Sequence, residues 1–396
     1  MAGHNLELTS GRDVNQTSSY TSKTEILQEN VQIFGNWIMA ILEQAANGIP
    51  VPALHRGHGM SSALLYKWCS KAITGERMNK THAGKKNRQI PIEIRLLNKV
   101  HILPFLKRYG LRKYKICNYS IGNDEQIHIL LAKTITERKQ RIFAPAESNT
   151  EYAAISFIID WQNGGILHHE VSTFGILKPD LHFIQRLKNG FLLVGSRTRH
   201  APNAFVIDTE GKIVTAFNCG DGIEQCLVDR QNRIITSYFD EGVFGGSIGT
   251  HGVVTWSPQG ELLWKNQEYT IYDCYAVNLD SRDNLWFYYF REFNLVRTNY
   301  EIDTVFHPGI SGSNGFLLYH NDTMLLFDAG YNRQGEFIAK TICEEKATLS
   351  RGNPAMFMWN GERIVPEKFS FRASKALLWD AANCLYYTQW RNDTMV

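Results

Sequence analysis

The sequence predicts a mainly β protein: a six-bladed β-propeller, with five or seven blades as alternatives, preceded by a basic α-helical module. Three observations point to this fold class. A hairpin-like segment recurs along the second part of the chain, apolar residues change from a helical to a strand spacing near residue 115, and positive charge concentrates before that point. At 396 residues the chain is long enough for two or three domains.

The repeat is the strongest of these observations. Asp229 opens a segment that ends on Tyr238-Phe239, and Asp280 opens a similar segment 51 residues further on. A second hairpin type, at 206–214 and again at 255–263, alternates with the first. Copies of the first type begin at Leu187, Asp229, Asp280 and Asp380. Two alternating hairpins make four strands in about 40–50 residues, which is typical of a propeller blade.

A β-sandwich is the alternative to a propeller, but a sandwich does not require two hairpin types to alternate at a constant spacing. Residues 115–390 hold about six such periods. We expect the hairpin at 377–390 to pair with strands near 115–133, because closing the ring removes exposed sheet edges.

The first part of the chain has helical periodicity. Residues 1–25 are polar and predict a flexible tail, 26–114 predict the basic helical module, and 115–396 predict the propeller. Within the module, apolar residues recur at three- and four-residue spacing and predict helices over 29–46, 52–58, 61–72 and 91–109. Pro104 should kink or divide the last of these.

Charge is distributed unevenly. The chain carries a formal net charge of +3, yet residues 49–115 hold fifteen Lys and Arg against two Glu, which leaves the rest of the chain at −10. A solvated basic face is one explanation. We favour binding of a nucleic-acid backbone, because each Lys or Arg at a phosphate releases condensed counterions.

The segment from Ala53 to Trp68 resembles the helix-turn-helix of insertion-sequence transposases and their accessory proteins. The resemblance extends over residues 53–72 and implies that the second helix lies in the major groove of DNA. An ordinary helical hairpin is the alternative, and no transposase catalytic region follows. The residues expected to contact DNA are Arg56, Ser61, Ser62, Tyr66, Lys67, Lys71, Lys85, Lys86 and Arg88.

A second candidate site follows the Asp229 hairpin. The Tyr-Phe-Asp-Glu-Gly-Val segment from Tyr238 resembles uncharacterised bacterial six-bladed propeller proteins, and this departure from the repeat suggests a ligand site. Adjacent carboxylates beside glycines could bind a hard cation or exchange protons. A β-bulge whose carboxylates cap backbone groups is the alternative. The expected ligand-binding residues are Tyr238, Asp240, Glu241 and His251.

Lactonase-type six-bladed propellers hold a divalent metal in the central pore through Glu, Asn and Asp from different blades. The corresponding metal candidates in this chain are Glu224, Asp240, Asp273 and Asn314. There are therefore two functional hypotheses. The first is a propeller binding protein that contacts nucleic acid through its basic module and holds a protein or small ligand on the propeller face. The second is a metal-dependent propeller hydrolase or lactonase. No catalytic residue is assigned, and a divalent cation in the pore is the one cofactor considered.

Three classes are disfavoured by composition. Seven cysteines without a CxxC pair argue against a zinc ribbon or a disulfide framework and predict free thiols, mostly buried. The longest apolar runs are shorter than the roughly 20 residues that span a bilayer. The polar first 25 residues lack the order of a secretion signal, so we expect a cytoplasmic protein with no membrane partner.

Overall fold

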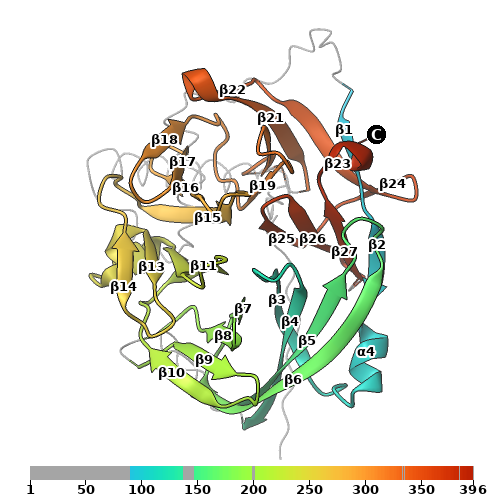
Figure 1. Cartoon of the computed structure of the whole chain (residues 1–396), viewed down its shortest axis with the longest axis vertical. Coiled ribbons are helices and arrows are strands. Elements are labelled where there is room, and N and C mark those ends of the chain that lie inside the picture. Colours follow the sequence, from blue (N-terminus) through green and yellow to red (C-terminus); the bar gives the residue numbers. More distant parts are fainter. Residues whose placement is uncertain are drawn as a thin grey trace, which may run out of the picture. The chain divides into compact units, whose positions relative to one another are not determined.

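The computed structural model describes residues 90–395 apart from 137–146, 199–200, 332, 334 and 383. These residues form a β-propeller, with twisted sheets arranged around a central channel (Figure 1). The prediction of a mainly β propeller is confirmed. The expected tail at 1–25 and the helices expected before residue 90 lie outside the described residues.

Five of the sheets are antiparallel and have four strands each. Their strands follow in order from the channel outwards. The first sheet has β3 (Lys115–Ile121), β4 (Ile127–Thr136), β5 (Glu147–Ile159) and β6 (Ile166–Pro179). The second has β7 (Phe183–Leu187), β8 (Gly190–Val194), β9 (Ala204–Asp208) and β10 (Ile213–Phe217). The third has β11 (Ile223–Val228), β12 (Ile234–Tyr238), β13 (Val253–Trp256) and β14 (Leu262–Lys265). The fourth has β15 (Asp273–Leu279), β16 (Leu285–Phe290), β17 (Asn294–Thr298) and β18 (Asp303–Phe306). The fifth has β25 (Lys368–Arg372), β26 (Lys375–Trp379), β27 (Cys384–Gln389) and β2 (Asn98–His101).

The remaining strands form one seven-stranded sheet. It contains β19 (Phe316–Leu318), β20 (Met324–Asp328), β21 (Phe337–Cys343), β22 (Thr348–Leu349), β23 (Asn353–Trp359), β24 (Glu362–Ile364) and β1 (Ile92–Arg95). Its innermost strand, β19, contacts β15 on one side and β25 on the other. The ring therefore contains five regular four-stranded blades and this larger sheet, whereas the repeat length predicted six blades, with five or seven as alternatives.

The recurring aspartates have a structural role in the turns. Asp229 accepts the backbone N–H groups of Gln231 and Arg233 between β11 and β12, at 2.9 and 2.8 Å. Asp280 accepts those of Arg282 and Asn284 between β15 and β16, both at 2.9 Å. The turn after Asp380 has the same bonds but joins β26 to β27, the second and third strands of its blade, so it is not equivalent to the other two turns.

The helix expected over 91–109 forms only in its last part. Residues 92–95 and 98–101 are strands β1 and β2, and helix α4 covers Ile102–Arg108. β1 pairs with β23 in parallel, and β2 pairs with β27 antiparallel. The propeller thus begins at Ile92 and not at Lys115, because these two segments satisfy their backbone hydrogen bonds in sheets formed by the far end of the chain. Pro104 lies in α4 without dividing it, since a first-turn proline loses no helical hydrogen bond.

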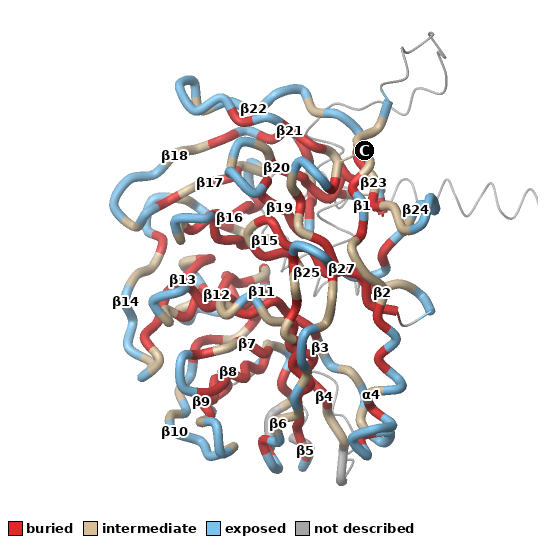
Figure 2. The backbone as a smooth tube through the Cα atoms, turned by 45° about the vertical axis from the view of Figure 1, so that its right-hand side comes forward, coloured by how far each residue is buried: buried red, intermediate tan, exposed pale blue. Residues whose placement is uncertain are grey.

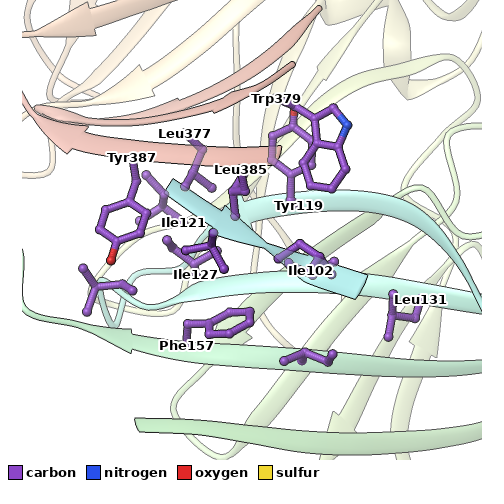
Figure 3. Packing of buried hydrophobic residues seen from close by; sticks show 14 of the residues in the cluster. Ile102, Tyr119, Ile121, Ile127, Leu131, Phe157, Leu377, Trp379, Leu385 and Tyr387 are labelled. Atoms are coloured by element: carbon purple, nitrogen blue, oxygen red, sulfur yellow. The ribbon is translucent and has the colours of Figure 1, made fainter. Parts of the chain in front are cut away.

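Closure of the ring combines both ends of the described chain. The expected closure between 377–390 and 115–133 is corrected in its pairing: Val100 lies opposite Leu385, so β2 supplies the outer strand of the last blade. Leu377 and Trp379 nevertheless pack on Tyr119 and neighbouring residues of β3 and β4 (Figure 3). The buried residues follow the inner strands, and the outer strands and turns are exposed (Figure 2).

Replacing Val100 with Asp should destabilise the whole ring. Val100 is 7% exposed in the seam between β2 and β27, and an unpaired carboxylate there costs several kcal/mol. We expect the free energy of unfolding in urea to fall by about 3 kcal/mol or more. Leu103→Asp introduces the same group three residues away at a side chain that is 68% exposed, and should change it by less than about 0.5 kcal/mol. Equal effects of the two variants would contradict closure through β2.

Candidate ligand site in the channel

The channel contains a cavity of about 190 Å³ lined by residues of all six innermost strands or of the loops beside them. Its polar lining residues are Asn118, Gln185, Glu224, Gln225, Asn314 and Ser370. Several of these bind neighbouring strands. Gln225, for example, accepts the backbone N–H of Val277 at 3.0 Å and donates to the carbonyls of Tyr275 and Asn314 at 3.3 Å. Such side chains are part of the ring's own hydrogen bonding.

Two lining residues are different. Gln185, on β7, is 3% exposed, and its Oε1 atom has no hydrogen-bond partner among the described residues. Glu224, on β11, has neither a hydrogen bond nor an ion pair within that same set. Buried polar atoms are nearly always paired, so an unpaired acceptor beside a cavity is a position at which a water molecule or a ligand can donate a hydrogen bond.

Glu224 belongs to a group of three carboxyl groups. Asp240 begins the short helix α5 (Asp240–Val243), and Asp273 is the first residue of β15. Burial, with the nearby charge of Asp240, raises the pKa of Glu224 from 4.5 to about 7. Burial, followed by the charges of Glu224 and Asp240, raises the pKa of Asp273 well above its ordinary value. Ionisation of all three groups at neutral pH would therefore destabilise the folded state.

The backbone around Asp240 explains why the Asp-Glu-Gly-Val segment leaves the repeat. A Cβ atom on Gly242 would lie 2.3 Å from the carbonyl oxygen of Asp221, so this position needs glycine. The close approach holds α5 against the loop before β11, the strand that carries Glu224. Asp240 is thereby held at 3% exposure, while its Oδ1 accepts the backbone N–H of Glu241 at 2.8 Å.

A row of aromatic rings comes from chain segments that follow or precede two of these carboxyl groups. Phe244, just after α5, meets Tyr272 edge-on at 5.3 Å, and Tyr272 meets Phe290 at 6.2 Å. Phe293 continues the row 5.1 Å from Phe290 and contacts Tyr331 at 6.1 Å. All but Phe290 are partly or largely exposed. Phe244 follows Asp240 by four residues and Tyr272 directly precedes Asp273, but none of the five rings lines the channel cavity.

The predicted ligand residues separate into different roles. Tyr238 is fully buried, and its hydroxyl donates to the carbonyl of Cys219, so it belongs to the core. Glu241 is exposed and pairs with Arg197. His251 contacts the carbonyl oxygen of Asn266 through Nδ1 at 2.9 Å, which fits a structural role. Asp240 alone of the four lies in the acidic group.

The metal candidates come together only in part. Glu224, Asp240 and Asp273 are neighbours, and Asn314 lines the same cavity as Glu224. Within the described residues, however, no three His, Cys, Asp or Glu side chains form a group that could hold a metal ion. The backbone N–H of Asn314 donates to Asp328 at 3.1 Å, which fixes this residue beside β20.

The predicted DNA-binding residues, from Arg56 to Arg88, lie outside the described residues. The prediction of free thiols is confirmed for the six described cysteines, of which four are buried and Cys117 and Cys343 are exposed. No helix in the described part of the chain is long and apolar enough to cross a membrane.

Sequence reasoning missed Gln185 and the aromatic row. A glutamine between Ile184 and Arg186 in an apolar strand is a weak signal, because many inward-facing polar side chains only bridge neighbouring strands. The rings come from four separate connections between strands, so their proximity follows from the arrangement of the blades and not from any local pattern.

Comparisons with known proteins do not assign a function. No family model matches the chain, and no curated protein matches its sequence. Among solved structures it is similar to Hsv2 from Kluyveromyces marxianus, with a TM-score of 0.42, 11% identity, and coverage of 71% of this chain and 78% of that chain. It is also similar to virginiamycin B lyase from Staphylococcus aureus, with a TM-score of 0.40, 10% identity, and coverage of 74% and 87%. AztD from Citrobacter koseri has a TM-score of 0.38 at 8% identity, with coverage of 67% and 80%.

The raised pKa of Glu224 predicts a pH-dependent stability. The folded state holds a proton on this carboxyl up to about pH 7, whereas the unfolded chain loses it near pH 4.5. The free energy of unfolding should therefore fall as pH rises from 4.5 to 7, by up to about 3 kcal/mol from this group. Glu224→Gln, which mimics the protonated form, should remove that part of the slope in urea titrations at pH 5 and pH 8. An unchanged slope would show that Glu224 ionises normally.

Proposed function

We propose that this chain is a propeller binding protein whose channel takes a small organic cation. The observation that carries the proposal is the pair of unpaired acceptors in the cavity wall, the Glu224 carboxyl and Gln185 Oε1, together with the nearby charge of Asp273. A ligand that brings N–H donors and a positive charge would satisfy the acceptors and offset the repulsion among the carboxyl groups.

The charge of the ligand follows from what the chain itself does not supply. Among the described residues, no Lys, Arg or His nitrogen lies within 4 Å of a carboxyl oxygen of Glu224 or Asp273. Elsewhere the same region pairs its acids, as in the Arg197–Glu241 pair. Like-charged groups kept together without a counter-charge cost stability, and a bound cation would recover that cost.

Aromatic side chains in the cavity wall, among them Phe183 and Phe369, favour an organic cation over a metal ion. Ammonium groups bind the faces of Tyr and Phe rings, and this attraction increases when the site is shielded from water. The cavity size agrees, since a cavity of about 150 Å³ can hold benzene.

A metal-dependent hydrolase or lactonase is the second candidate. It is favoured by the position of Asn314 in the same cavity as Glu224, because amide and carboxylate oxygens together suit a hard divalent cation. The described carboxylates do not form a ready metal group, so this candidate requires movement of α5 or of the start of β15 when the ion binds.

Calorimetry with matched charged and uncharged compounds tests the proposal. Benzylammonium and butylammonium should bind, whereas benzyl alcohol and butanol should bind at least tenfold more weakly. Affinity for the cations should rise between pH 6 and pH 8, because protons compete for the Glu224 carboxyl, whose pKa is about 7.

The matched variants are Glu224→Gln and Glu241→Gln, which make the same chemical change in the channel and at an exposed ion pair. We expect Glu224→Gln to weaken cation binding tenfold or more and Glu241→Gln to leave it within twofold. Equal binding of the alcohols, or equal effects of the two variants, would overturn the proposal. Tight binding of Ca²⁺ or Mn²⁺ that depends on Glu224, without binding of the ammonium compounds, would favour the hydrolase.

A further inference from the structure

Helix α4, the loop that follows it and the first residue of β3 carry a run of exposed basic side chains. We define the α4 surface as the exposed side chains of Lys107, Arg108, Arg112, Lys113 and Lys115. Within the described residues, no carboxylate lies within 4 Å of any of their charged groups, whereas most other described arginines have such a partner. Five unneutralised charges over nine residues need an explanation.

Helix electrostatics explains only part of this surface. Lys107 and Arg108 occupy the last turn of α4, where positive charge complements the helix dipole. Arg112, Lys113 and Lys115 lie beyond the helix, so the dipole gives no reason for them. Ordinary solvation also explains exposed charge, but it does not favour a single sign at successive positions.

The surface is held rigidly. Ile102 and Leu106 are buried in the hydrophobic core that also contains Leu377 and Trp379 of the last blade. Leu111, which is 6% exposed, packs in the same core and holds the loop after the helix. Phe105 packs edge-on against Phe157 at 5.0 Å. Because the apolar face of this segment is fixed, its charged side chains stay together, and a rigid charged surface loses less entropy on binding than a flexible one.

We propose that the α4 surface binds the phosphate backbone of a nucleic acid. The positive charge matches a polyanion, and counterion release makes such contacts favourable without base recognition. Tyr109 lies within the surface at 36% exposure, and its ring meets that of His169 at 5.7 Å. A partly exposed aromatic ring among cations is the combination that accepts unstacked bases, which favours nucleic acid over a purely charged partner.

The test uses the full chain and the salt dependence of binding to a labelled 20-base DNA, as a duplex and as a single strand. A triple variant, Arg112→Gln, Lys113→Gln and Lys115→Gln, should lower the slope of log affinity against log salt by about 2–3, because each lost phosphate contact removes roughly 0.7–0.9. The single-strand and duplex arms show which form is preferred.

The matched control is Lys188→Gln, Lys212→Gln and Arg351→Gln, which removes the same charge from exposed positions on other parts of the propeller. We expect its slope to equal that of the unmodified chain, and both triple variants to keep the melting temperature. Tyr109→Ala should weaken single-strand binding more than duplex binding.

Equal slopes for the two triple variants, or no DNA binding at 50 mM salt, would overturn the proposal. So would binding to phosphatidylserine vesicles that depends on the α4 surface when DNA binding does not. Glu224→Gln should leave DNA binding unchanged, so failure here is distinguishable from failure of the channel proposal.

Discussion

The pairing of β2 with β27 is the constraint on which the rest of the structure depends. A propeller whose ends do not meet leaves two sheet edges unpaired and part of its core in water. Here Asn98–His101 completes the blade formed by the last strands, and β1 adds to the neighbouring sheet in the same way. The channel therefore exists only when residues almost 300 positions apart are together.

Closure of the ring keeps carboxyl groups together that would otherwise repel one another. Glu224, Asp240 and Asp273 come from two neighbouring blades. Burial, with the charges of neighbouring carboxyl groups, raises the pKa values of Glu224 and Asp273, and this lowers the free energy of unfolding at neutral pH. Buried residues of the strands in these two blades, Ile234 to Ser237 and Trp286 to Tyr288, offset the stability lost at the carboxyl groups. Stability lost locally in a site of this kind is commonly related to function.

The blade repeat could be predicted because the chemistry of its turns is local: Asp229 and Asp280 bind backbone N–H groups within four residues of themselves. The strands at 92–101 could not, because their apolar spacing also fits a helix and their partners lie at the other end of the chain. The same distinction applies to the site. Resemblance and repeat analysis selected Glu224, Asp240 and Asp273, but they also selected Tyr238 and His251. The side chains of Tyr238 and His251 bind the backbone carbonyls of Cys219 and Asn266 and have structural roles. Whether a polar residue is satisfied depends on contacts between blades, which no local pattern shows.

A crystal structure of the chain with benzylammonium at pH 8 would test the channel proposal most directly. We predict the ligand nitrogen within about 3.2 Å of a Glu224 carboxyl oxygen, as a charge-assisted hydrogen bond requires, and a second donor contact to Gln185 Oε1. A channel occupied only by water, with the ligand absent or bound on the outer surface of the blades, would contradict it.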